Sequence, residues 1–298
     1  SLLLIFNQNK MKKLTYLLFC LSIAAFGQNT LIPDPNFEQA LIDLGYDTAP
    51  INGSVPTATI SGITNLNVFD KNISDLTGIE DFTALTDLYC SDNQLTSLDV
   101  SNNTALTSLY CSDNQLTSLD VSNNTALTGL GCWDNQLTSL DVTQNTALIN
   151  LACGSNIQPP FSSSNQLTSL DVSNNTALTV LYCGSNQLTT LDVSNNTALT
   201  DLRCENNQIS NLDLSNQEEL ESLICYSNQL TSLDLRNNPL TGFVRGDINR
   251  LPDFFVTNNP DLSCILVDDV SFATGFLTRK DDTTSYVTNE AECDAVAL

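Results

Sequence analysis

Residues 85–105 read LTDLYCSDNQLTSLDVSNNTA, and near-copies of this 21-residue unit begin at Leu106, Leu127, Leu148, Leu178, Leu199 and Leu220. Weaker copies begin at Ile63 and Leu240, which makes about nine coils. Apolar residues alternate twice in each unit, as in Leu88-x-Cys90 and Leu98-x-Val100, and this is the period of a strand with one buried face. A fixed repeat of this length predicts a solenoid whose coils bury their apolar residues against one another. We therefore expect parallel β-strands on both broad faces, a short N-terminal cap helix and little other helix.

The repeated pattern Leu-x-x-Leu-x-Leu/Cys-x-x-Asn-x-Leu resembles the leucine-rich-repeat signature. Its division into ten and eleven residues, with a cysteine in the first strand, resembles secreted bacterial leucine-rich-repeat proteins with nested repeats. The coil that begins at Ile63 resembles the first coil of internalin-like repeats. The resemblance covers roughly residues 31–293, and it implies that the first strand of each unit lines the concave side of the solenoid.

Four segments are expected along the chain. Residues 1–27 are read as upstream residues and a signal peptide, because Met11-Lys12-Lys13 precedes an apolar stretch that ends in Ala25-Phe26-Gly27. Residues 28–62 form the N-terminal cap, 63–261 the leucine-rich-repeat solenoid, and 262–298 the C-terminal cap. The predicted cap helix has Asp34 as its N-cap and Pro35 as its first residue. It has Gly45 at its end and an apolar face made of Phe37, Leu41 and Leu44.

The chain is strongly acidic, with 34 Asp and Glu against 10 Lys and Arg. Three of the lysines belong to the expected presequence, and no Lys or Arg occurs between Lys71 and Arg203. Such a surface repels phosphate backbones and anionic headgroups, so we expect no nucleic-acid partner and no membrane insertion. The chain contains no histidine, which excludes Ser-His-Asp and Cys-His catalysis and the commonest zinc sites. No cofactor is expected.

One asparagine recurs at the same place in each half of the unit. The first series is expected to form an inward ladder that bonds turn backbone groups: Asn93, Asn114, Asn135, Asn186, Asn207 and Asn228. The second half contributes Asn103, Asn124, Asn145, Asn175, Asn196 and Asn238, with Gln217 as its one departure. These amides are structural.

Seven cysteines share one inward strand position: Cys90, Cys111, Cys132, Cys153, Cys183, Cys204 and Cys225. They replace leucine, are odd in number and project in parallel, so a ladder of free thiols is favoured over a set of disulfides. Cys264 and Cys293 lie outside this series and are expected to pair.

The unit that begins at Leu148 carries nine extra residues, and its segment 157–165 is rich in proline and serine. It is expected to form a loop insertion that either binds through Phe161 or is a tolerated interruption.

Outward positions beside the ladder cysteines carry Tyr89, Tyr110, Trp133, Tyr182 and Tyr226. Tyrosine and tryptophan are enriched in binding surfaces, although tyrosine also simply favours strands. We expect these five residues to form a ligand-binding concave face.

The other face repeats an aspartate in register, beginning with Asp99, Asp120 and Asp141. Weak Ca²⁺ binding there is possible in principle, but an exposed row of this kind is also stable when water screens the charges.

These features together indicate a secreted or cell-surface module that binds protein or glycan. We expect it to work as a monomer and to mediate adhesion. Two alternatives stay open, a calcium-dependent structural surface protein and, less favoured, a carboxylate-dependent glycan-active enzyme. The enzyme needs two acids with different pKa values in a cleft, whereas the repeated aspartates are equivalent.

Overall fold

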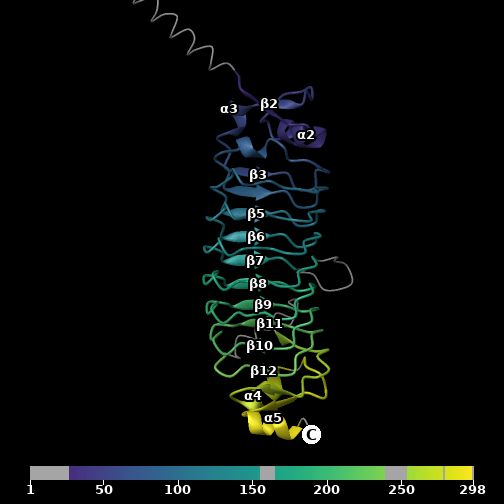
Figure 1. Ribbon diagram of the computed structural model, residues 1–298, viewed down its shortest axis with the longest axis vertical. Helices are drawn as coiled ribbons and strands as arrows, with labels where there is room; N and C mark the ends of the chain where they lie inside the picture. The colour runs from purple at the N-terminus through teal and green to yellow at the C-terminus, as the bar shows by residue number, and fades with distance from the viewer. Residues whose placement is uncertain (1–26, 155–164, 239–253, 278, 297–298) are drawn as a thin grey trace, which may run out of the picture.

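The computed structural model describes residues 27–154, 165–238, 254–277 and 279–296. The expected signal peptide, apart from Gly27, lies outside the described residues, and so does Phe161 with most of the insertion. The coils stack along one axis, from the cap elements labelled α2, β2 and α3 to α4 and α5 at the other end (Figure 1). None of the helices in the described ranges has the length and apolar character needed to cross a membrane.

The main sheet has nine parallel strands, one from each coil. In spatial order they are β3 (Asn65–Asn67), β4 (Asp87–Tyr89), β5 (Ser108–Tyr110), β6 (Gly129–Gly131), β7 (Asn150–Ala152), β8 (Val180–Tyr182), β9 (Asp201–Arg203), β11 (Ser222–Ile224) and β13 (Phe254–Phe255). From β3 to β11 the central leucine of each strand pairs with that of the next, as Leu88 does with Leu109, and Leu223 of β11 pairs with Phe254 of β13. Because these leucines are buried, the residues on either side of them face outward.

The second broad face is less regular than expected. Its sheet has only four strands, β10 (Leu212–Asp213), β12 (Leu233–Asp234), β14 (Cys264–Leu266) and β15 (Ser285–Val287). In the earlier coils the inward alternation persists, with Val100 and its equivalents buried, but these segments belong to no strand in the described ranges. The carboxylate of Asp99 accepts a hydrogen bond from the Ser101 amide at 2.9 Å, which turns the backbone directly after the short extended segment. The same bond, from the Ser215 amide to Asp213, is present in β10, so it does not decide which coils pair. In the described ranges, strand pairing on this face begins at β10.

The first asparagine ladder bonds one coil to the next. The Asn135 Oδ1 atom accepts from the Leu116 amide at 2.9 Å, and its Nδ2 donates to the carbonyl oxygens of Cys111, Cys132 and Trp133 at 3.0–3.2 Å. The other members make the same kind of bonds. Between Asn135 and Asn186 the place is taken by Asn165, which bonds the Leu137 amide at 3.0 Å.

The second ladder is bonded on one side only. Asn124 Nδ2 donates to the carbonyl oxygens of Val100 and Asn103 at 3.0 and 2.9 Å, and Gln217 Nε2 donates to that of Val193 at 2.7 Å. The side-chain oxygens of this series are buried and receive no hydrogen bond from the described residues. The two ladders, which look alike in sequence, therefore differ in how much they bond.

All seven cysteines of the inward series are fully buried and free. Burial raises the pKa of Cys111 and Cys153 to about 12, so these side chains stay protonated and pack as small apolar groups. Cys264 and Cys293 are joined by a disulfide, which ties β14 to α5 (Glu290–Val296).

The N-terminal cap consists of β1 (Asn29–Leu31), α2 (Pro35–Asp43), β2 (Ser54–Pro56) and α3 (Thr57–Ile60), and η1 (Ile79–Asp81) follows in the first coil. Asp34 caps α2 and also accepts hydrogen bonds from the amides of Ser74 and Asp75, which attaches the helix to the first coil. Phe37 and Leu41 are buried as expected, but Leu44 is 43% exposed because it is the C-cap residue and lies beyond the buried face. Helix α4 (Val270–Phe276) lies in the C-terminal cap.

Candidate functional site

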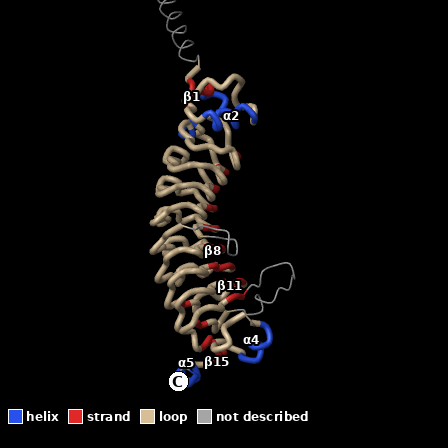
Figure 2. Tube along the Cα trace, turned by 90° about the vertical axis from the view of Figure 1, so that its right-hand side faces the viewer, coloured by secondary structure: helices blue, strands red, loops and turns tan. Residues whose placement is uncertain are grey.

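The outward face of the nine-stranded sheet is the surface on which the sequence placed a ligand. Figure 2 shows these strands along the inner side of a gently bent solenoid, so we call it the concave face. It carries two columns of outward residues. The column before the ladder cysteines is Tyr89, Tyr110, Gly131, Ala152, Tyr182, Arg203 and Ile224, and the column after them is Ser91, Ser112, Trp133, Gly154, Gly184, Glu205 and Tyr226. The five expected aromatic residues lie in these columns, but they do not form one continuous row.

Three of these aromatic residues form a compact group that we call the aromatic patch: Tyr89, Tyr110 and Trp133. The rings of Tyr89 and Tyr110 are stacked, with centroids 5.4 Å apart and planes 2° from parallel. A Cβ atom at Gly131 would lie 2.6 Å from Trp133 Cζ3 and 2.7 Å from Tyr110 Cδ1. The absence of a side chain at Gly131 therefore lets both rings close over the sheet, and all three stay partly exposed.

Carboxylates border the aromatic patch where the strands turn. Asp92, Asp113 and Asp134 each have a left-handed backbone, with φ of 55°, 54° and 50°, a conformation that Asp tolerates better than most residues. Burial, followed by the neighbouring Asp113, raises the pKa of Asp134 to about 6. Burial and Asp92 also raise the pKa of Asp113, although hydrogen bonds from Ser112 and Trp133 act against this. This edge of the patch is therefore acidic.

Tyr182 belongs to a second group, which is polar. Its hydroxyl donates to Asp201 Oδ2 at 2.9 Å, and the Ser222 hydroxyl donates to Asp201 Oδ1 at 2.9 Å. The Arg203 guanidinium lies over the Tyr182 ring at 4.5 Å from its centroid, and Arg203 Nε is 3.6 Å from Asp201 Oδ1. Tyr182 is thus held in place by an ion pair that the sequence reasoning did not anticipate.

Tyr226 differs from the other four aromatic residues because it is only 8% exposed. Its ring packs against Phe255 with centroids 4.8 Å apart, and its hydroxyl accepts from Asn206 Nδ2 at 3.3 Å. Expected as a ligand-contacting residue, Tyr226 is instead covered by its neighbours. The half-buried Phe255 presents the aromatic surface there.

Glu205 lies in the second column, two residues after Arg203, and is 6% exposed. A Cβ atom at Gly184, in the preceding coil, would lie 2.6 Å from Glu205 Cδ, so the carboxylate fills the space that Gly184 leaves. Burial raises the pKa of Glu205 to about 7, with Asp201 adding to the rise and Arg203 opposing it. Among the residues of the concave face that the structure describes, it is the one buried acid.

The sequence reasoning missed several residues of the concave face and of the ladder. Arg203 and Glu205 are the charged members of otherwise neutral columns, so a column-by-column alignment of the units would have found them. Phe69 is 50% exposed in the first coil, at the position of Trp133. Asn259 extends the first ladder by bonding the Leu230 amide at 3.2 Å. It follows Val256 as the other ladder residues follow their cysteines.

The repeated aspartates lie on the opposite face, and their carboxylates are engaged locally. Asp120 and Asp141, like Asp99, accept a hydrogen bond at 2.9 Å from the amide two residues ahead. These bonds lower the pKa of all three carboxyl groups. The row therefore has a structural role in the turns.

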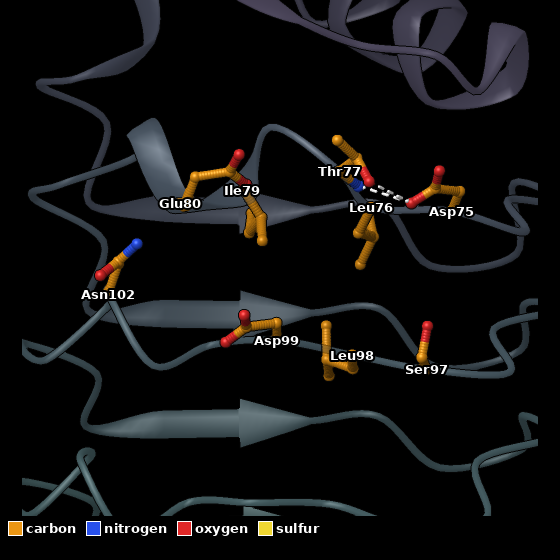
Figure 3. Close-up of a pocket in the computed structure, with 9 residues that line it drawn as sticks. All are labelled: Asp75, Leu76, Thr77, Ile79, Glu80, Ser97, Leu98, Asp99 and Asn102. Atoms are coloured by element: carbon orange, nitrogen blue, oxygen red, sulfur yellow. Dashed lines mark hydrogen bonds between the residues drawn. The ribbon is translucent and has the colours of Figure 1, made fainter.

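A hollow of about 310 Å³ lies on this face beside Asp99 (Figure 3). The carboxylates of Asp75, Glu80 and Asp99 lie at separate places around it, and that of Asp75 accepts from the Thr77 amide and hydroxyl. Within the described ranges no group of three or more acids or cysteines is arranged to hold a metal ion.

Comparison with known proteins agrees with the architecture. The Leucine Rich Repeat family model matches residues 229–251. The internalin InlF from Listeria monocytogenes superposes with a TM-score of 0.64 and 24% sequence identity, over 88% of this chain and 72% of InlF. Internalin C2 from the same organism gives a TM-score of 0.52 and 24% identity, over 80% and 97%.

The functional domain of InlJ from Listeria monocytogenes, which includes a cysteine ladder, aligns at 26% identity over 87% of this chain and 72% of that domain, with a TM-score of 0.38. A search of curated proteins finds no match. The superpositions on InlF and internalin C2 show that the chain has an internalin-like leucine-rich-repeat fold.

Proposed function

We propose that this internalin-like leucine-rich-repeat protein is a non-enzymatic binding module that recognises a protein partner with its concave face, and that the aromatic patch is the centre of the contact. The observation that carries the proposal is the arrangement of Tyr89, Tyr110 and Trp133, three partly exposed rings held together over a glycine. Rigid aromatic side chains offer a large contact area and lose little conformational entropy on binding.

The surroundings of the patch support a protein contact. Its border is acidic, because Asp92, Asp113 and Asp134 follow the same strands. Between Lys71 and Arg203 no basic residue balances these charges. A neutral or basic protein surface complements such a face, whereas nucleic acid and anionic lipid are repelled.

We propose that the protein acts outside the cell or at the bacterial cell surface, as a monomer. The basic and apolar presequence in residues 1–27 supports export, and the adhesive role follows from the combination of export with a binding face. Exposed aromatic residues that cluster on a soluble surface mark a site of contact with a partner.

The experiment compares two triple variants of the chain without residues 1–27. In the first, Tyr89, Tyr110 and Trp133 are replaced by serine; in the matched control, Asp99, Asp120 and Asp141 on the opposite face are replaced by asparagine. Both are tested against arrays of bacterial and host surface proteins and of glycans, with and without Ca²⁺.

We expect the aromatic variant to lose at least tenfold in affinity for the protein that the parent chain binds, while the control variant binds normally. The thermal unfolding of both should change little, since the aromatic side chains lie outside the core and asparagine keeps the side-chain oxygen that accepts the turn hydrogen bond. Loss of binding in the control alone, or binding only with Ca²⁺, would favour the calcium-dependent structural alternative. Binding confined to glycans would replace the protein partner with a sugar.

A further inference from the structure

Two of the three buried acids in the described ranges are fully hydrogen-bonded, and the partly exposed Asp47 and Asp134 each have, like Glu205, one shielded carboxylate oxygen without a hydrogen bond. Among the described residues, Asp34, Glu38 and Glu205 are the buried carboxylates. Glu38 is fully buried and accepts from the amides of Asn52 and Gly53 at 2.6 and 2.7 Å, and Asp34 is bonded through both oxygens. Glu205 Oε2 is equally shielded but accepts no hydrogen bond.

The backbone amide of Glu205 supplies one hydrogen bond to its own carboxylate, but a carboxylate oxygen that has lost water without gaining a donor is still costly. The space for Glu205 exists because two successive coils carry glycine at this column. A Cβ at Gly154 would meet the Gly184 backbone oxygen, and one at Gly184 would meet the Glu205 carboxylate itself. The fold thus forms a site around the carboxylate, and residue 205 belongs to an outward column of the concave face.

No neighbouring group neutralises Glu205 fully. Arg203 is the nearest base, but it is paired with Asp201 and lies against Tyr182. The other groups that interact electrostatically with Glu205 are Asp201, the phenol of Tyr226 and the thiols of Cys183, Cys204 and Cys225, and none of them is cationic. With Glu205 ionised, this cluster holds two carboxylates and one guanidinium, so its net charge is negative and one more positive charge would neutralise it.

We propose that Glu205 is the anchor point for one basic side chain, a lysine or arginine, of the protein partner, an inference that rests on the proposed function. An ammonium or guanidinium group supplies both the missing N–H donor and the missing charge. A metal ion fits less well, since a single carboxylate does not make a metal site and the described residues hold no metal-binding group.

The test uses small cations as probes and needs no knowledge of the partner. Butylammonium chloride represents the lysine side chain, and tetramethylammonium chloride carries the same charge without an N–H donor. Backbone amide spectra of the chain without residues 1–27 are recorded at pH 8 during titration with each salt. We expect saturable shifts at Gly184 and at residue 205 with butylammonium and none with tetramethylammonium.

Two variants identify the residue responsible. Glu205→Gln keeps the shape of the side chain but removes its charge, and Glu219→Gln removes the same charge from an exposed position at the end of the same coil. The apparent affinity for butylammonium should fall at least tenfold in Glu205→Gln and stay unchanged in Glu219→Gln. Equal affinity in the two variants, or equal shifts with tetramethylammonium, would overturn the proposal.

The parent chain supplies a second readout that does not depend on how the variants fold. At pH 5 Glu205 is protonated, because burial raises its pKa to about 7, so the response to butylammonium should disappear and return at pH 8. A response of equal strength at both pH values contradicts the inference. The serine variant of the aromatic patch should keep the response, so failure of the proposed function and failure of this inference give different results.

Discussion

Asn135 illustrates how a residue of the first ladder bonds the backbone. It bonds four backbone groups of two coils, whereas Asn124 in the second ladder bonds two and leaves its oxygen unpartnered. Leucine at either place fits a buried site but removes every bond. The cost of such a change follows the number of backbone groups that lose their partner.

We therefore expect Asn135→Leu to lower the free energy of unfolding by roughly 1–3 kcal/mol and Asn124→Leu by less. Urea unfolding of the two variants and the parent measures both changes. If Asn124→Leu costs as much as Asn135→Leu, the difference between the two ladders has no energetic meaning.

The raised pKa of Glu205 leads to a prediction about the stability of the fold that does not depend on binding. Its pKa rises from an ordinary 4.5 to about 7 in the folded chain, so between these pH values the folded state holds a proton that the unfolded state has released. Stability contributed by this group is therefore present below pH 4.5 and is lost as the pH rises toward 7.

Glu205→Gln removes this titration. Relative to the parent, we expect the variant to be more stable by roughly 1–3 kcal/mol at pH 8 and nearly unchanged at pH 4. Urea unfolding at the two pH values checks this, with Glu219→Gln as the control that should differ little from the parent at either. A stability difference that is the same at pH 4 and pH 8 would mean that Glu205 does not titrate in this range.

At the scale of the elements, the cysteines of the inward strand position allow a prediction of how many free thiols the chain has. Without residues 1–27, the ladder contributes seven thiols and the C-terminal cap one disulfide. A thiol reagent should find almost no reactive cysteine in the folded chain and seven after unfolding without reductant. Fewer than seven, with ladder peptides cross-linked in mass spectra, would contradict the packing described here.

The repeat explains why most of the elements could be predicted from sequence. Positions such as Leu88, Cys90 and Asn93 recur in every coil, so a single physical argument applies to all of them. The irregular features were harder to predict. Asn165 supplies the ladder amide only after the insertion. The second face pairs as strands only from β10 onward, although its apolar alternation is the same in the earlier coils.

The concave face was predicted less well than the ladders for the same reason. Its residues differ from coil to coil, so each depends on neighbours that the repeat does not specify. Tyr226 has the same sequence context as Trp133, yet Phe255 covers it. The sequence reasoning considered aromatic residues alone and therefore did not include Arg203 and Glu205.

For the whole molecule, the dominant property is its charge, a formal −24 at pH 7 over 298 residues. Between Lys71 and Arg236 the only base is Arg203, and it is already paired. A field of this sign attracts a basic partner over distances of about 10 Å at 0.1 M salt.

We expect the association rate with the protein partner to fall roughly tenfold between 20 mM and 300 mM NaCl, with a much smaller change in the dissociation rate. Surface plasmon resonance over this range measures both rates. An association rate that is independent of salt would mean that the acidic surface plays no part in partner recognition.

The central claim is that the aromatic patch is buried by the partner, and Trp133 allows a direct test because it is the only tryptophan in the chain. Incorporation of 5-fluorotryptophan gives one ¹⁹F resonance that an unlabelled partner cannot obscure. Its shift between H₂O and D₂O, which reports contact with solvent, should be clear in the free chain and nearly absent when the partner is saturating. A resonance whose position and solvent shift are unchanged at saturation would contradict the claim that the concave aromatic patch is the binding surface.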